Sequence, residues 1–336
     1  PAARAFLESG EYVLHAHGPR NFPLTYADSR MSRRTGRYSP TRLYLAERKN
    51  LPGLAGQHHR QLALPENRQR ISAFDLLWFS EAEDDPGASD PPLDRLFKGP
   101  TPLAVWRGSW RDPDALYVAM VAGNNPGPHG HLDLGGFELR ADGVAWIRDL
   151  GKDNYSLPGY WETEPGGRRW NYTRLGTQGH NVPMLDGRQQ RTPCRAEFAN
   201  WGTPENPGVT VDLSSAYAPA KVLRDLRVVD DRRAVLLTDT IEAEPETAVA
   251  WGLTVFGDVE PGEDGRTVLL RHDNKALKLE RLAPAGGSWS VEPLDPIHPE
   301  VDPFPEKCRR LIFRKRSGNS TTEIKVKFTR EATPAE

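Results

Sequence analysis

The spacing of apolar residues divides the chain into two stretches. In the first hundred residues, apolar side chains recur at helical spacing in two short segments, 39–52 and 72–83. Ser39 and Ser72 stand where a helix N-cap is expected, and a proline follows the last apolar residue of the first segment. We therefore predict two short helices, followed by a polar linker over residues 81–94.

Beyond about residue 100 the pattern changes to short strands rich in β-branched and aromatic residues. The segments are 102–110, 115–123, 136–151, 221–244, 247–257, 266–273, 275–282, 287–294, 309–317 and 322–328. Turn signals separate them, and residues 137–147 read as a hairpin. So many strands without helices between them predict a large antiparallel β-sandwich. The predicted fold class is mainly β, with a short helical domain (1–98) before the sandwich (99–336).

Composition agrees with this fold and narrows the function. Glycine and proline number 30 each, which disfavours long helices. No run approaches the roughly 20 apolar residues of a membrane span, so no membrane partner is expected. Lys plus Arg number 44 and Asp plus Glu 46, so the chain is no polycation and no nucleic-acid partner is expected. An acidic polymer would need a local positive surface.

Processing and redox state leave weaker signals. The chain lacks a starting Met and has no basic segment followed by an apolar one. We interpret it as a processed or truncated product without a signal peptide of its own. Cys194 and Cys308 form no metal motif, and both a disulfide and a buried free thiol remain open for them.

Residues 124–187 hold the candidate chemistry. On an extended segment His129 and His131 point the same way, together with Asp133. Placing imidazoles side by side is costly unless a metal or a carboxylate uses them. Asp149 ends the following hairpin, and His180 begins another apolar strand. Imidazole and carboxylate ligands suit zinc.

Other histidine pairs carry less weight. An isolated pair two residues apart is weak support for a metal site, and the chain has a second one, His15 and His17. We interpret that pair as structural or surface, because no third ligand accompanies it. His58 and His59 are adjacent, so their side chains diverge, and both are expected to be solvated.

Three motifs in this stretch resemble a known family. The segments "PHGHLDLGGFEL", "IRDLGKDNY" and "RWNYTRLGTQGHNVPMLDG" are similar in order, spacing and flanks to the heparinase II/III-type lyases of heparan sulfate, alginate and related uronates. The resemblance implies an N-terminal (α/α) toroid before a C-terminal β-sandwich. Residues 21–31 resemble a late toroid loop, so most of the toroid is expected to be missing from this chain.

The resemblance also implies roles for single residues. The catalytic histidine falls on His129, and the zinc ligands fall on His131, Asp149 and His180. The zinc would be structural and hold the loop that aims the catalytic histidine. Gly136 stands where the family usually has Ser, which is expected to affect only local packing.

Three further residues are candidates for substrate binding. In the family, the loop that carries Tyr155 and Tyr160 faces the substrate groove. An equal alternative is that both rings pack beneath a Gly/Pro-rich loop. Arg174 can bind a carboxylate bidentately or pair internally. The family's catalytic tyrosine lies in the toroid, and neither Tyr26 nor Tyr38 is favoured as its substitute.

The predicted function is a bacterial polysaccharide lyase, or its C-terminal half, that cleaves a uronate polymer such as a glycosaminoglycan or alginate by β-elimination. Its partners would be an acidic polysaccharide or oligosaccharide and the missing toroid half, in the periplasm or outside the cell. Two alternatives remain open. One is a non-catalytic carbohydrate-binding or structural domain. The other is a zinc hydrolase, although the nearby acid, Glu138, is expected to point away from His131.

Overall fold

The computed structural model describes residues 2–29, 39–79, 90–127, 129–294, 296–298, 303–318 and 321–331. The chain forms two compact units, one of Pro1–Leu24 with Ser32–Arg95 and one of Thr25–Met31 with Leu96–Glu336. Thr25–Met31 therefore groups with the strand-rich unit, although helices flank it in the sequence. Tyr38 and most of the predicted linker lie outside the described residues.

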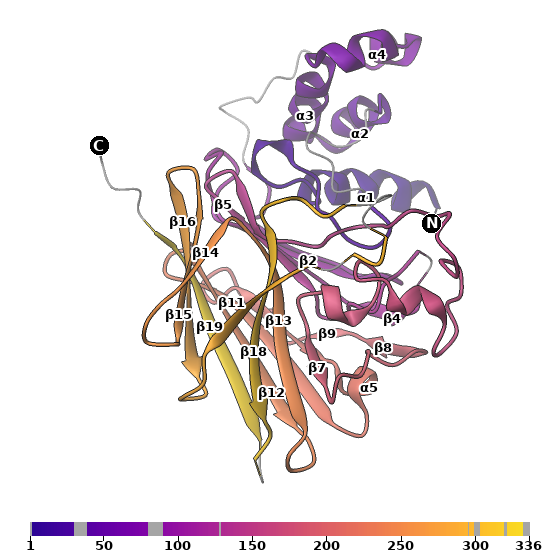
Figure 1. The fold of residues 1–336 in the computed structure, drawn as a ribbon. Coiled ribbons are helices and arrows are strands. Elements are labelled where there is room, and N and C mark those ends of the chain that lie inside the picture. Colours follow the sequence, from indigo (N-terminus) through magenta and orange to yellow (C-terminus); the bar gives the residue numbers. More distant parts are fainter. Residues whose placement is uncertain are drawn as a thin grey trace. The chain divides into compact units, whose positions relative to one another are not determined.

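The first unit is helical (Figure 1). Its helices are α1 (Ala2–His15), α2 (Thr41–Lys49), α3 (Pro52–Leu62) and α4 (Ala73–Leu77). The two predicted helices correspond to α2 and α4, and Ser72 caps α4 in a capping box with Asp75. Helices α1 and α3 were not predicted. Pro52 opens α3, because its fixed φ and missing N–H suit a first helical turn.

The histidine pairs of this unit are structural. His15 and His17 are buried, and the Nδ1 of each bonds the carbonyl oxygen four residues earlier. The prediction that His58 is solvated is wrong, since it is fully buried and bonds Asp75 at 2.9 Å. Adjacent helix positions do diverge, and here that divergence sends His58 into the interior of the unit.

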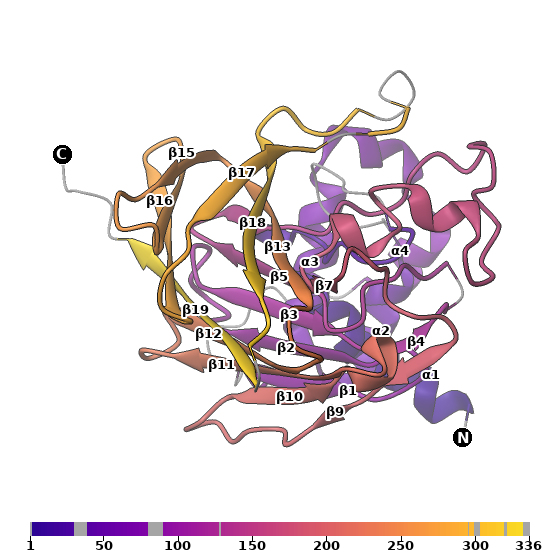
Figure 2. The ribbon, with the colours of Figure 1, turned by 60° about the horizontal axis from the view of Figure 1, so that its bottom comes forward.

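The second unit holds two large antiparallel sheets (Figures 1 and 2). One has nine strands in the order β1 (Asp94–Phe97), β2 (Leu103–Arg107), β3 (Tyr117–Val121), β5 (Phe137–Ala141), β6 (Val144–Ile147), β13 (Ala248–Phe256), β18 (Cys308–Arg316) and β17 (Trp289–Pro293), with β7 (Pro183–Leu185) also paired to β13. The other has β14 (Asp258–Pro261), β15 (Thr267–His272), β16 (Lys275–Ala283), β19 (Thr322–Glu331), β12 (Ala234–Glu242), β11 (Lys221–Val229), β10 (Gly208–Asp212) and β9 (Phe198–Ala199). A small pair joins β4 (Gly123–Asn125) to β8 (Cys194–Ala196), and α5 (Ser214–Tyr217) is one short turn.

The core lies between the two large sheets. Alternate residues of each strand point into it, as in β11, where Val222, Leu226 and Val228 are buried. Trp146 and Trp251 enter the same hydrophobic cluster from the nine-stranded sheet. The predicted mainly β, antiparallel sandwich is therefore confirmed. Cys194 and Cys308 are both free thiols.

Within the described residues, no helix combines the length and apolar character needed to cross a membrane.

Candidate metal centre and active site

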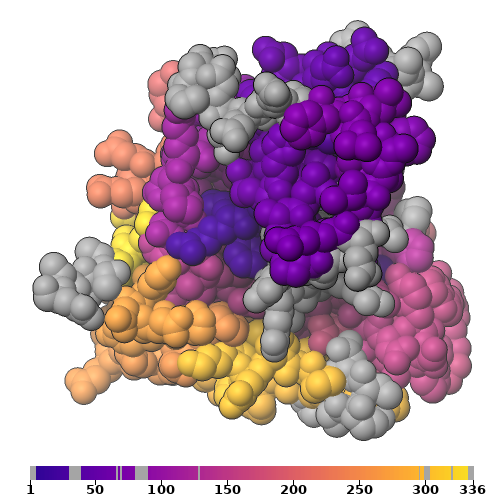
Figure 3. All heavy atoms as spheres, turned by 90° about the horizontal axis from the view of Figure 1, so that it is seen from above, coloured from indigo at the N-terminus to yellow at the C-terminus, as the bar shows by residue number. Residues whose placement is uncertain are grey.

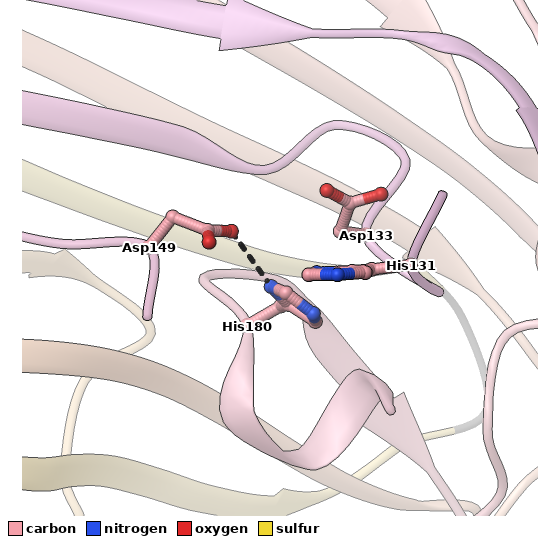
Figure 4. A group of neighbouring side chains, drawn as sticks. All are labelled: His131, Asp133, Asp149 and His180. Carbon is pink, nitrogen blue, oxygen red and sulfur yellow. Dashed lines mark hydrogen bonds and ion pairs between the residues drawn. The ribbon is translucent and has the colours of Figure 1, made fainter. Parts of the chain in front are cut away.

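Four buried side chains from three loops meet in the strand-rich unit. His131, Asp133, Asp149 and His180 each offer one ligand atom, and these atoms lie within 4.8 Å of one another (Figure 4). His131 and Asp133 come from the loop between β4 and β5, Asp149 follows β6, and His180 precedes β7. The structure thus brings the three predicted zinc ligands together and adds Asp133.

The loop that carries the histidines is not extended, so that prediction is wrong. His129 has a left-handed φ of 55° and lies in a turn. The loop closes with a tight turn in which Gly136 N donates to Asp133 O at 2.7 Å. A Cβ on Gly136 would lie 2.8 Å from the same oxygen, so a serine here would have to shift the turn. His129 and His131 still face a common partner, as described below.

The donor set fits a metal ion. His131 Nδ1 and His180 Nε2 are buried and have no hydrogen-bond partner in the described part of the chain. A buried polar atom left unpaired costs about 1–3 kcal/mol, which a bound cation would offset. The other nitrogens are occupied: His131 Nε2 bonds Asp28 at 3.1 Å and His180 Nδ1 bonds Asp149 at 3.0 Å. Two imidazoles with one or two carboxylates form a set that zinc accepts.

Electrostatics point the same way. Burial tends to raise the pKa of Asp149, but His180 and His131 hold it below its usual value. For Asp133, burial dominates and raises the pKa. Burial opposes the charged form of His180, yet the carboxylate of Asp149 raises its pKa. The carboxylate of Asp149 thus favours positive charge beside it, which either a protonated His180 or a bound divalent cation can supply.

Asp28 connects the candidate catalytic histidine to this cluster. Its Oδ2 bonds His129 Nδ1 at 2.9 Å, and its Oδ1 bonds His131 Nε2 at 3.1 Å. Oδ1 also accepts from the Tyr160 hydroxyl at 2.7 Å and from Arg169 Nη2 at 3.0 Å. The side chain is only 4% exposed. Burial raises the pKa of this carboxyl, but the hydrogen bonds from His131, Tyr160 and His129 outweigh that effect and hold it well below its usual range.

Sequence reasoning did not single out Asp28 as a site residue. It lies 101 residues before His129, and nothing in its immediate sequence marks it as a partner. The available signal was the resemblance of residues 21–31 to a toroid loop of the family. The part of that segment from Thr25 onward groups with the strand-rich unit, and it delivers the carboxylate of Asp28 to both histidines.

A cavity of about 470 Å³ opens onto His129. Tyr26, Asp28, Asp133 and Tyr155 are among its lining residues. The His129 side chain is 54% exposed, and Nδ1 makes the one hydrogen bond of this ring within the described residues. Tyr155 stacks on the ring with centroids 6.1 Å apart. The imidazole is thus held at Nδ1, which leaves Nε2 available to a ligand.

The predicted substrate-binding residues lie in different surroundings. Tyr155 is 38% exposed and lines the cavity. Tyr160 is buried and donates to Asp28, and burial together with that hydrogen bond raises its pKa. Arg174 is buried, donates to the Leu150 carbonyl and lies over the Phe304 ring at 4.8 Å. In this structure, then, Arg174 pairs internally.

Two charged groups near the site are already engaged. The Glu138 carboxylate pairs with Arg140 at 2.8 Å and accepts from Asp149 N at 3.2 Å. Glu138 therefore supports the backbone of the candidate ligand Asp149 and is not one of the four residues of the His/Asp cluster. Arg168 pairs with Glu162 at 2.5 Å on the surface, which offsets part of the basic character expected around this loop.

A buried arginine holds both ligand loops in place. Arg224 of β11 donates from Nη1 to Gly135 O at 2.7 Å and to Asn181 O at 2.6 Å. Gly135 follows the His131–Asp133 loop, and Asn181 follows His180. The same guanidinium pairs with Asp239 of β12 at 2.6 Å, and both side chains are fully buried. The eight-stranded sheet thus fixes the spacing of the two loops that lead into β5 and β7 of the nine-stranded sheet.

Residues 103–327 match the model of the family described as heparinase II/III-like, C-terminal. Together with the sandwich and the buried His/Asp cluster, this match defines the class of protein. The chain belongs to the heparinase II/III-like family.

Solved structures share the fold. A heparinase III has 16% identity and a TM-score of 0.68, with 96% of this chain and 45% of that chain covered. The heparan sulfate lyase HepC from Pedobacter heparinus has 16% identity and a TM-score of 0.67, with 97% of this chain and 46% of that chain covered. A further heparinase III has 14% identity and a TM-score of 0.67, with 98% of this chain and 48% of that chain covered. The chain thus spans less than half of each of these proteins, and identities this low establish the fold alone. No curated protein sequence matches the chain.

Proposed function

We propose that this chain is the C-terminal part of a polysaccharide lyase that cleaves a uronate-containing polymer by β-elimination. The observation that carries the proposal is the accessible His129, fixed by Asp28 at the edge of a cavity and next to a buried metal-type cluster. The titles of the similar structures name heparinases and a heparan sulfate lyase, which favours an acidic polysaccharide as substrate.

β-Elimination removes the proton at C5 of the uronate, stabilises charge on its carboxylate and breaks the C4–O bond. It needs a base, an acid and a partner for the developing negative charge. His129 would take one of the proton-transfer roles or contact the carboxylate through Nε2. The carboxylate of Asp28 fixes the ring and stabilises it when it is protonated, much as a buried aspartate does in a catalytic triad. Tyr155, stacked on His129, would contact the sugar ring.

The metal role follows from the same geometry. His131, Asp149 and His180 would hold zinc, with Asp133 as a further carboxylate beside them. Bound zinc would fix the loop that carries His129 rather than act on substrate. Asp28 would then serve as the outer partner of the ligand His131, a contact that typically fixes ring orientation and strengthens metal binding.

The helical unit is proposed to be the end of an (α/α) toroid. Around α4, large apolar side chains are exposed, namely Ile71, Phe74, Leu76, Leu77 and Phe79. Atoms of α3 and α4 lie on the face drawn in Figure 3. So many exposed apolar residues on one short helical stretch are typical of a surface that another element covers. We propose that preceding toroid helices cover it and supply the catalytic tyrosine, in a periplasmic or secreted bacterial enzyme.

A non-catalytic carbohydrate-binding domain is the second candidate. The observation in its favour is that the exposed Tyr155 lines the cavity at His129, where an aromatic ring can stack on a sugar without any reaction. A zinc hydrolase is disfavoured because Glu138, the candidate base, is paired with Arg140. Product chemistry separates the three possibilities. A lyase forms an unsaturated uronate that absorbs in the ultraviolet, a hydrolase forms a saturated product, and a binding domain forms none.

Substitution of His129 by alanine tests the proposal. We expect turnover of heparan sulfate or alginate, followed by ultraviolet absorbance, to fall by about 10²–10⁴-fold, because one positioned proton-transfer group is lost. Zinc content should not change, since His129 is not in the metal-type group. Assays are run on the chain alone and on the chain supplemented with a toroid half.

His272→Gln serves as the matched control, because His272 lies on β15, away from the cavity. Equal losses of turnover in both variants would indicate general damage to the fold rather than loss of a catalytic group. Cleavage without an absorbing product would contradict the lyase. Binding of polymer with no product in either assay would favour the carbohydrate-binding domain.

Asp28 provides an independent prediction. Asp28→Ala removes the carboxylate that pairs with Arg169 and accepts from Tyr160, which leaves a buried charge without its partner. We expect a destabilisation of about 3–5 kcal/mol by urea unfolding, together with about 10–100-fold weaker zinc binding through the lost contact to His131. Glu260→Gln, at a surface ion pair with Arg271 in which both side chains are more than half exposed, should change neither quantity appreciably. Unaltered zinc affinity in Asp28→Ala would show that the contact to His131 does not support the metal.

A further inference from the structure

A second and larger cavity lies on the outer face of the nine-stranded sheet. It has a volume of about 740 Å³ and is bounded by residues of β7, β13, β17 and β18. Its floor is made by the outward-facing Ala250 and Gly252 of β13 and Ile312 of β18, while the neighbouring Trp251 and Leu253 point into the core. Small side chains on the outer face therefore leave the hollow. None of its lining residues lines the cavity at His129.

The charges around this cavity are mostly positive. Its cationic lining residues are Arg310, Arg314, Lys315 and Arg316, against the single carboxylate of Glu292. Glu292 is neutralised by Arg314, with 2.6 Å between Nη1 and Oε1. The whole chain carries a formal charge of −2, so this concentration of positive charge is local.

Arg310 is the most informative of these cations. Only 6% of it is exposed, and its guanidinium donates to His180 O at 2.7 Å and to Thr254 Oγ1 at 3.2 Å. Both acceptors are neutral. Among the described residues, Glu292 is the carboxylate that acts on Arg310, through space and without an ion-pair contact, and it is already paired with Arg314. A buried charge that has only a shared counterion is costly, and an anion in the cavity would offset that cost.

The backbone accommodates this arrangement. A Cβ on Gly252 would lie 2.4 Å from Arg310 Nη2, so the absence of a side chain there lets the guanidinium lie across β13. Thr173 and Gln178 add polar groups to the cavity wall. The volume falls within the usual range for small-ligand sites, about 300–1,000 Å³.

We propose that this cavity is a second binding site for an acidic saccharide, with a carboxylate or sulfate group received by Arg310. It would hold part of a chain apart from the sugar at His129. The choice of a saccharide rests on the proposed function, whereas the anion site rests on the cavity and its buried arginine alone. Arg314 and Arg316 lie at the more exposed part of the lining and would contact further anionic groups.

Two variants separate this site from the other cavity. Arg310→Gln removes the charge but also alters a contact to His180 O, so its zinc content must be checked. Ala250→Leu fills the floor without altering a charged group, and it leaves the metal-type residues untouched. Both are prepared in the full chain and compared with wild type and with His129→Ala.

The probes are an unsulfated uronate tetrasaccharide, a heparan sulfate tetrasaccharide and sodium sulfate, titrated calorimetrically at two salt concentrations. We expect a tetrasaccharide to bind His129→Ala about as well as wild type, and both Arg310→Gln and Ala250→Leu about tenfold or more weakly. Binding of the unsulfated tetrasaccharide would show that a carboxylate is sufficient, whereas binding of the heparan sulfate tetrasaccharide alone would identify sulfate as the recognised group.

Binding that survives in both cavity variants but disappears in His129→Ala would overturn the second site and leave the lyase proposal intact. Sulfate binding as tight as that of either tetrasaccharide would overturn the saccharide assignment. If no lyase product is detected but saccharide binding still depends on Arg310, the proposed function would be overturned and this site supported.

Discussion

Replacement of His131 by alanine is expected to abolish the zinc binding proposed for the His/Asp cluster and to lower the thermal stability of the strand-rich unit. His131 is buried, and its ring centroid lies 5.2 Å from that of His180, so it supplies one of the two imidazoles of the cluster. The free energy of binding a structural zinc contributes directly to folding, with apparent values of about 10–16 kcal/mol in small zinc domains. Loss of one of few ligands should therefore reduce both metal content and Tm strongly.

Elemental analysis of the chelator-washed chain, together with thermal unfolding with and without added zinc, tests this prediction. Wild type should hold zinc near stoichiometry, and its Tm should fall when the metal is removed. His15→Ala is the matched control, because His15 is also buried in a pair spaced by two residues but belongs to the helical unit. It should lose stability without losing zinc.

Two results would contradict the assignment. Full metal content in His131→Ala would show that His131 is not a ligand. A wild-type chain without zinc would show that the His/Asp cluster does not form the family's metal centre, and the carbohydrate-binding domain would become the favoured function.

The sequence predicted the strands of the two sheets well, because their alternating apolar residues reflect a core shared by facing sheets. Long strands such as β11, β12 and β13 were recognised, whereas short edge strands such as β9 and β14 were not. An edge strand of two to four residues buries too little surface to leave a periodic pattern.

The site was predicted in part, and the limit has a physical cause. His131, Asp149 and His180 lie in one stretch of sequence, so a motif can connect them. Asp28 joins the site through packing across 101 residues, which no local pattern encodes. Tyr160 shows a further limit: its sequence context fits a groove, but its hydroxyl turns inward to Asp28. Side-chain direction in a loop depends on such tertiary hydrogen bonds.

The apolar residues of α4 show the opposite case. Phe74 and Leu77 have the helical spacing of a buried face, yet they are 53% and 71% exposed. The pattern correctly indicates an apolar face, and the chain contains nothing within its described residues that covers it. The sequence pattern therefore identifies an apolar face but not the element that would cover it.

The buried pair of Arg224 and Asp239 leads to the second large prediction. Asp239→Ala would leave the Arg224 charge in the core and deprive Trp251 Nε1 of its acceptor. We expect a loss of about 3–5 kcal/mol in the free energy of unfolding, measured with urea. The surface pair of Lys221 and Glu242 lies on the same two strands, with side chains 72% and 53% exposed. Glu242→Ala is therefore a matched control and should cost about 0–1 kcal/mol.

A double variant separates stability from the metal site. Arg224→Met with Asp239→Leu replaces the buried ion pair by apolar side chains and should recover most of the lost stability, because no charge remains unpaired. It cannot restore the hydrogen bonds from Arg224 to Gly135 O and Asn181 O, which fix the loops of His131 and His180. Zinc affinity should therefore stay about 10–100-fold below wild type even in the stable double variant. Recovery of both stability and zinc affinity would mean that the loops hold their geometry without Arg224, and that the ion pair serves the core alone.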